Sequence, residues 1–195
     1  MAAWKDLERR VAKYFKTQRR KRGADFSQSD VEIIADIDTW LGESRITPTG
    51  YIIAECKYRS SGLGIVDSFL KIRNNDKHTL GFLGEDCIVT SLTSFNEIFQ
   101  CIIDPCNRTG ILVDKLHEYE IVTIKERCPG YVNEWMDQAR SYVHKPTVHG
   151  SGNNCIIPIL CLAKARRQGI YAVFCVSDVQ TFHKAKNSTC IDNYE

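Results

Sequence analysis

Apolar side chains recur at helical spacing along the first part of the chain. Trp4, Leu7, Val11 and Phe15 lie three or four residues apart with charged residues between them, which predicts an amphipathic helix over residues 3–16. Glu8 lies beside this apolar stripe rather than opposite it. The same kind of spacing predicts further helices over 65–72, 95–103 and 131–143.

Runs rich in β-branched and aromatic residues alternate with these helices. Residues 31–37 and 50–58 are predicted to pair as an antiparallel hairpin with a wide loop, and the apolar second run favours a position buried on both faces. Further strands are expected over 88–90, 120–125, 155–163 and 170–176. The last two are interpreted as a hairpin with a basic turn, although a helix over 159–168 is the alternative.

The order of these elements predicts an α/β protein with a central mixed β-sheet flanked by helices. A length of 195 residues suits one domain with one sizeable core. Residues 60–130 are interpreted as an elaboration of that single domain, and we expect them to supply a dimer contact or substrate choice.

Composition narrows the class of protein. No apolar run approaches the length of a membrane span, and the first residues lack the apolar region of a signal peptide, so we expect an intracellular protein. Nine cysteines at irregular spacing, without a Cys-x-x-Cys pair, are typical of reduced thiols. A structural zinc or iron–sulfur site that pairs cysteines with His117, His144 or His149 remains an alternative.

Positive charge is concentrated at the N-terminus. Residues 1–22 hold nine Lys or Arg against two acidic residues, a formal charge of +7, so the remainder carries −5 within the chain total of +2. A basic element on a mildly acidic body is typical of a polyanion-binding protein. A solvated helix face or a localisation tail would give the same pattern.

Two carboxylates and a lysine are placed where the predicted hairpin would bring them together. Side chains alternate along a strand, so Glu55 and Lys57 share one face and Cys56 points to the other. Asp30 begins the first strand, beside Glu55 if the strands pair. Converging carboxylates suit a hard cation with oxygen ligands, and Lys57 would have partners on an otherwise apolar face. Asp36 or Asp38 could replace Asp30 as the ligand.

The stretches Asp30-Val31-Glu32-Ile33-Ile34 and Ile52-Ile53-Ala54-Glu55-Cys56-Lys57 resemble the PD-(D/E)XK nuclease superfamily, with Ser29 in place of the proline. A small chain whose first helix carries Glu8 is similar to the Holliday-junction resolvase branch of phages and archaea. Gln138 and Tyr142 form a Gln-x-x-x-Tyr that resembles a motif of RecB-type nucleases. About 70 residues separate Lys57 from the predicted helix over 131–143 that carries this motif, more than in compact members of the superfamily.

The resemblance implies a restriction-endonuclease-like core and Mg²⁺-dependent hydrolysis of DNA, with Mn²⁺ able to substitute. Asp30, Glu55, the main-chain carbonyl of Cys56 and Glu8 would bind the metal, and Lys57 would orient the attacking water or stabilise charge on the phosphorane. Gln138 and Tyr142 would support the site. The expected DNA-contacting residues are Arg9, Arg10, Lys13, Arg19, Arg20, Lys21, Arg22, Ser29, Arg166 and Arg167.

A branched DNA substrate with two-fold symmetry implies a homodimer. Two other classes stay open at this point. One is a RecB-like or restriction-like DNA nuclease or exonuclease, and the other is a non-catalytic DNA-binding module on the same fold. Glu55 and Lys57 as a solvent-facing cross-strand pair is the simplest structural alternative.

Overall fold

The computed structural model describes residues 3–15, 31–35, 50–59, 63–72, 78–103, 117–141, 155–164 and 169–182. The helices are α1 (Ala3–Tyr14), α2 (Gly64–Ile72), α3 (Leu92–Ile103) and α5 (Gly130–Ser141). The strands are β1 (Val31–Ala35), β2 (Gly50–Tyr58), β3 (Thr79–Leu83), β4 (Cys87–Ser91), β5 (Glu120–Lys125), β6 (Cys155–Ala163) and β7 (Tyr171–Cys175).

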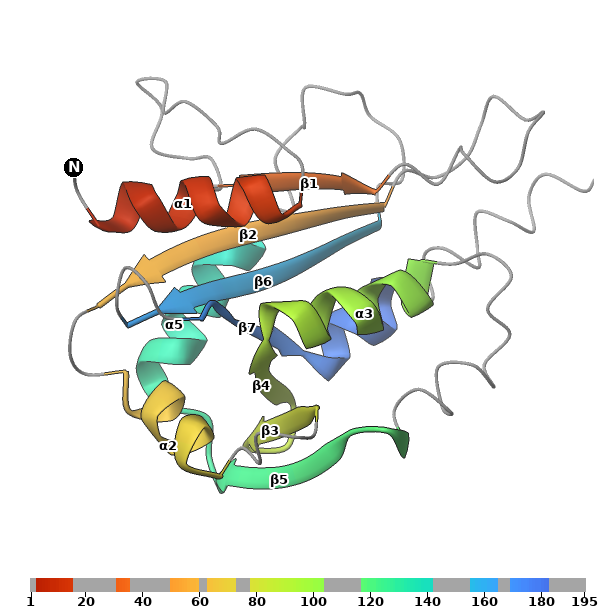
Figure 1. Cartoon of the computed structure of the whole chain (residues 1–195). Helices are drawn as coiled ribbons and strands as arrows, with labels where there is room; N and C mark the ends of the chain where they lie inside the picture. The colour runs from red at the N-terminus through yellow and green to blue at the C-terminus, as the bar shows by residue number, and fades with distance from the viewer. Residues whose placement is uncertain are drawn as a thin grey trace, which may run out of the picture.

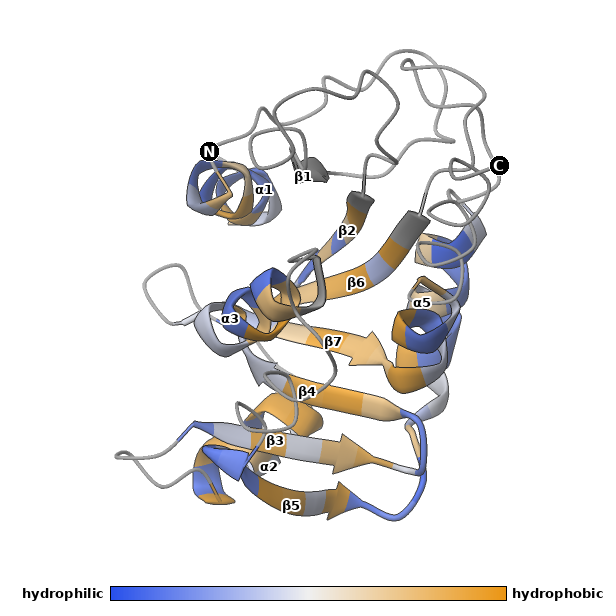
Figure 2. Ribbon diagram, turned by 90° about the vertical axis from the view of Figure 1, so that its right-hand side faces the viewer, coloured by the Kyte–Doolittle hydropathy of each residue, from blue (hydrophilic) through white to orange (hydrophobic). Residues whose placement is uncertain are grey.

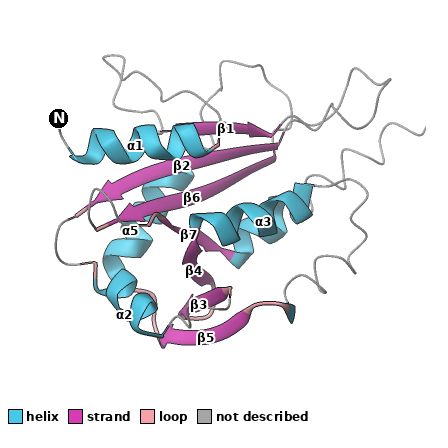
Figure 3. Ribbon diagram, viewed as in Figure 1, coloured by secondary structure: helices cyan, strands magenta, loops and turns pink. Residues whose placement is uncertain are grey.

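These strands form one mixed sheet in the order β1-β2-β6-β7-β4-β3-β5 (Figures 1 and 3). β2 pairs with β6 and β3 pairs with β5 in parallel, while the other neighbours are antiparallel. In the predicted hairpin, Val31 pairs with Ala54 and Ala35 with Gly50. The sheet therefore places β2 between the edge strand β1 and the buried strand β6.

Helices cover both faces of the sheet, with α1 and α3 on one side and α5 on the other (Figures 1 and 2). On the α1 side, Leu7 and Val11 pack in one core with Ile52, Ala54 and aromatic residues of α3. On the α5 side, Val132 and Met136 pack in a second core that includes residues of α2, β6 and β7. A sheet buried on both faces explains the continuous apolar runs of its central strands.

Most predicted elements are confirmed with small shifts in their bounds. The helix expected from 95 begins at Leu92, because Ser91 caps it: the Ser94 amide donates a hydrogen bond to Ser91 Oγ at 3.1 Å. The first strand ends at Ala35, and 36–37 lie outside the described residues. β6 continues to Ala163, which excludes the alternative helix from 159 to that point.

Strand β3 was not predicted, and it changes the interpretation of residues 60–130. β4 pairs with β7, β3 pairs with β4, and β5 pairs with β3, so this segment extends the central sheet. Its strands share both cores with the rest of the sheet. None of the described helices combines the length and apolar character that crossing a bilayer requires.

Candidate active site on strand β2

Strand β2 divides its side chains between the two faces of the sheet. Ile52, Ala54 and Cys56 belong to the core beneath α1. Because side chains alternate along a strand, Glu55 and Lys57 project to the opposite face, toward α5. Their contacts with Gln138 of α5 confirm the shared face that the sequence predicted.

Glu55, Lys57 and Gln138 form a closed triangle of hydrogen bonds. Lys57 Nζ donates to Glu55 Oε1 at 2.6 Å and to Gln138 Oε1 at 3.0 Å. Gln138 Nε2 donates to the same Glu55 oxygen at 2.9 Å. The Glu55 side chain is 4% exposed and that of Lys57 is 23% exposed, so a buried carboxylate is held by a lysine that solvent can reach. This burial argues against the pair as an ordinary solvent-facing ion pair.

A cationic and aromatic rim lies beside the triangle. The Trp135 ring has Arg59 over it at 4.9 Å and Lys57 Nζ at 5.9 Å from its centroid. Tyr131 packs against Trp135 edge to face at 5.0 Å, and burial raises the pKa of its hydroxyl. Sequence reasoning missed Arg59 and Trp135. The sequence could have indicated Trp135, because Tyr131, Trp135 and Gln138 are spaced by four and three residues and so share one helix face.

Glu8 is buried on the other side of the sheet. It is 3% exposed and lies between Leu7 and the Val11–Ala12 turn of α1, the residues that pack toward β2. α1, whose buried residues include Glu8, and α5, which carries Gln138, cover opposite faces of the sheet (Figure 2). A carboxylate beneath a helix stripe is the unusual feature that the sequence had indicated.

Several predicted site residues fall outside the described ranges. Among them is Asp30, which directly precedes Val31, the residue paired with Ala54. Asp36 and Asp38, the alternative ligands, also lie outside. So do the support residue Tyr142 and the DNA-contacting candidates Arg19, Arg20, Lys21, Arg22, Ser29, Arg166 and Arg167. Cys56 is described, with its side chain buried in the α1-side core.

Glu55 fits the role of a ligand to a hard cation, because it supplies a buried carboxylate at the C-terminal end of β2. Within the described ranges, however, the group of three or more metal-ligating residues lies elsewhere, at Asp86, Cys87 and Cys175.

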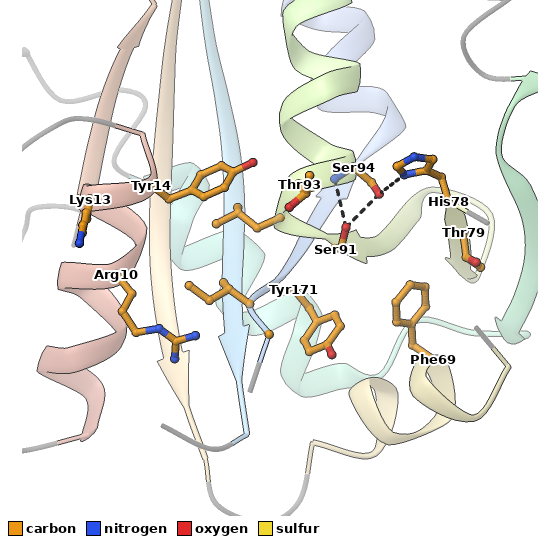
Figure 4. Close-up of a pocket in the computed structure, with 13 residues that line it drawn as sticks. Arg10, Lys13, Tyr14, Phe69, His78, Thr79, Ser91, Thr93, Ser94 and Tyr171 are labelled. Carbon is orange, nitrogen blue, oxygen red and sulfur yellow. Dashed lines mark hydrogen bonds between the residues drawn. The ribbon is translucent and has the colours of Figure 1, made fainter. Parts of the chain in front are cut away.

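Basic residues of α1 line a cavity on the α1 side. Arg10 and Lys13 face a hollow of about 800 Å³ that also reaches His78 and Tyr171 (Figure 4). Ser91, at the end of β4, and Ser94, in the first turn of α3, line the same cavity, and Ser94 Oγ lies 3.1 Å from His78 Nδ1. Cations and hydroxyls thus gather where the sequence predicted polyanion contacts. Arg9 is exposed on the same helix.

Comparisons with known proteins identify no relative of this chain. Neither a protein family, nor a curated protein, nor a solved structure matches the chain. Functional inference therefore rests on the geometry of the site.

Proposed function

We propose that the chain is a metal-dependent DNA endonuclease with a restriction-endonuclease-like core, whose catalytic residues are Asp30, Glu55 and Lys57. The observation that carries the proposal is the buried Glu55 carboxylate, held by Lys57 and Gln138 at the end of an apolar strand. A buried carboxylate paired with a lysine stabilises a fold less than hydrophobic residues would at the same positions, so its presence favours a chemical role for the pair.

The chemistry follows from the residue types. Mg²⁺ bound by Asp30, Glu55, the carbonyl of Cys56 and Glu8 would polarise the scissile phosphate and lower the pKa of a water bound to it. Lys57, beside the Glu55 carboxylate, would orient the attacking water or stabilise the charge that develops on the phosphoryl oxygens. Gln138 touches both and would keep the carboxylate and the amine in position.

Among DNA substrates, we favour branched DNA and a Holliday-junction resolvase. The support is the basic first helix, which carries the buried Glu8. The triangle made by Gln138 supports the alternative of a RecB-like nuclease, because there the corresponding helix residue supports the Glu-x-Lys strand. Both readings share the catalytic residues and differ in substrate.

The decisive experiment compares a labelled four-way junction with matched linear duplex, in Mg²⁺ and in EDTA. Wild type is expected to cut only the junction, by paired nicks that require the metal. Glu55→Gln preserves the shape of the side chain and removes its charge, and it should abolish cutting while DNA binding is retained. Asp137→Asn, at an exposed position on α5, is the matched control.

Each outcome separates the candidates. Metal-dependent cutting of both substrates would favour the RecB-like or restriction-like reading and reject junction selectivity. Release of mononucleotides from DNA ends would identify an exonuclease. Tight binding without cleavage in Mg²⁺ or Mn²⁺ would reject the enzyme and leave a DNA-binding module.

A further inference from the structure

Thiols from three separate segments meet on the α5 side of the sheet. Cys87 begins β4 and Cys175 ends β7, and the two are direct partners in the antiparallel ladder. Their sulfur atoms are 2.7 Å apart, and both are free thiols. Cys128, in the loop before α5, packs against the same core as Cys87 and Cys175 and lines the same hollow. Residues 41 and 47 positions apart in sequence thus converge on one point.

A carboxylate completes the cluster. A carboxylate oxygen of Asp86 and the sulfur atoms of Cys87 and Cys175 all lie within 4.8 Å of one another. Asp86 is held in place from behind: Ser177 donates its amide to Oδ1 at 2.8 Å and its hydroxyl to Oδ2 at 2.6 Å. Each carboxylate oxygen keeps a further lone pair, so a fixed Asp86 can still bind a cation.

The cluster opens to the surface. Asp86, Cys87, Cys128 and Cys175 all line one hollow of about 490 Å³, together with Arg140. Cys87 and Cys175 are themselves buried, while Cys128 is partly exposed. An ion could therefore enter from solvent and be enclosed by thiols at the base of the hollow.

We propose that Cys87, Cys128, Cys175 and Asp86 form a binding site for a thiolate-seeking metal ion of the Zn²⁺ class. Four donors in sulfur-rich surroundings suit the tetrahedral coordination that Zn²⁺ adopts at structural sites, and thiolates disfavour Mg²⁺. Zn–S bonds of about 2.3 Å separate two ligand sulfurs by roughly 3.7 Å in a tetrahedron. Cys87 and Cys175 would move apart by about 1 Å on binding, which rotation of their side chains can supply.

The hydrogen-bonded carboxylate is the feature that distinguishes a metal site from a thiol pair. A disulfide between Cys87 and Cys175 would use neither Cys128 nor Asp86. At metal centres, ligands are commonly oriented by hydrogen bonds from behind, as Ser177 orients Asp86. Of the histidines considered as partners of the cysteines, His117 does not line this hollow, and His144 and His149 lie outside the described residues.

A metal at this site would have a structural role. Cys128 lies two residues before α5 begins at Gly130, and α5 carries Gln138. The metal would fasten the start of this helix to the ladder of β4 and β7. This role is independent of the proposed nuclease activity, since binding is measured without DNA and without cleavage.

The test uses the reduced, metal-free full-length chain titrated with Co²⁺. Wild type should bind an equimolar amount, with a thiolate-to-cobalt charge-transfer band and the strong visible bands of tetrahedral Co²⁺, and Zn²⁺ should displace it. Cys128→Ser, at a partly exposed position, should weaken binding by about 10- to 100-fold, and Asp86→Asn should also weaken it. Cys101→Ser, a partly exposed cysteine of α3, is the control and should bind like wild type.

A thermal melt makes the test robust to misfolding. Zn²⁺ should raise the Tm of wild type and of Cys101→Ser, and should raise the Tm of Cys128→Ser by less. Absence of the charge-transfer band in wild type would overturn the proposal. So would equal binding by Cys128→Ser and wild type, or recovery of the chain with Cys87 and Cys175 joined in a disulfide and unable to bind Co²⁺ after reduction.

Discussion

At the scale of single residues, Lys57 has the clearest chemical role in the triangle. Lys57→Met keeps much of the side-chain length and removes the amine. Loss of a group that stabilises transition-state charge costs about 10²- to 10³-fold in rate, and we expect that loss in metal-dependent cleavage. Single-turnover cleavage with a parallel measurement of DNA affinity tests this. Equal losses in the cleavage rate and in DNA affinity would indicate that Lys57 binds DNA and does not act in catalysis.

Gln138 is predicted to be a positioning residue rather than a catalytic one. Its amide accepts from Lys57 and donates to Glu55, so Gln138→Ala frees both groups from one orientation. Residues that orient metal ligands typically contribute about 10- to 100-fold in metal affinity or activity. Cleavage rate against Mg²⁺ concentration should show a higher metal requirement that excess Mg²⁺ partly restores.

Asn133→Ala, at an exposed position on a different side of the same helix from Gln138, is the matched control for Gln138→Ala. It should leave the metal requirement unchanged. A drop in rate that Mg²⁺ does not restore for Gln138→Ala would contradict the positioning role.

Glu8 tests whether the two faces of the sheet serve one site. If this buried carboxylate contributes to the metal site, Glu8→Gln should raise the Mg²⁺ concentration needed for half-maximal cleavage by about tenfold, with DNA affinity unchanged. Glu8 and its amide replacement have nearly the same shape, so α1 should still pack on β2. An unchanged metal requirement would assign Glu8 a structural role and confine the site to the α5 side.

At the scale of elements, β3 shows how tertiary packing can override a weak local pattern. Gly81 lies at the centre of this strand, and a glycine within a short apolar run predicts a turn or a break rather than a strand. A Cβ at this position would overlap Ile124 Cδ1 and lie 3.0 Å from Phe69 Cδ2. The neighbours on β5 and α2 therefore require glycine here. We expect Gly81→Ala to lower the free energy of unfolding by about 1–3 kcal/mol, by overpacking.

Chemical denaturation checks the Gly81 prediction. Gly64→Ala provides a control, because an added Cβ at that helical position has nothing within 4 Å. It should be neutral or slightly stabilising, since alanine favours a helix. Equal stability of Gly81→Ala and wild type would show that Ile124 and Phe69 readjust at little cost.

Other elements could be predicted because pattern and packing agree. Strand β2 was located to the residue from its apolar run, and Glu55 and Lys57 were placed on one face by alternation alone. The contact of Lys57 with Gln138 spans 81 residues, and no local pattern specifies which helix covers which strand. The thiol cluster was missed for the same reason, since register between β4 and β7 aligns Cys87 with Cys175.

At the scale of the whole molecule, the sheet limits how residues 60–130 can contribute to a dimer. β4 lies between β7 and β3, so deleting this segment would expose an inner strand and remove part of both cores. Single substitutions on the edge strand β5, rather than deletion of the segment, are the appropriate test of whether residues 60–130 contribute to a dimer. Ile121 is 62% exposed there, and Ile121→Lys should leave the fold intact.

The dimer itself follows from the proposed substrate. A four-way junction presents two equivalent strands, and resolution requires a cut in each during one encounter, which two sites related by two-fold symmetry would provide. Mixing wild type with excess Glu55→Gln chains should form dimers with one active site. These are expected to convert junctions into singly nicked products, whereas wild type alone gives paired cuts. Labelling the two cleavable strands separately measures how many junctions are nicked once and how many are cut in both strands, and sedimentation establishes whether the chains form dimers.

If paired cutting falls only in proportion to the dilution of wild type, and no singly nicked product is formed, the chains act independently. Junction resolution by a two-fold dimer would then be wrong, while the catalytic assignment of Glu55 would stand on its own.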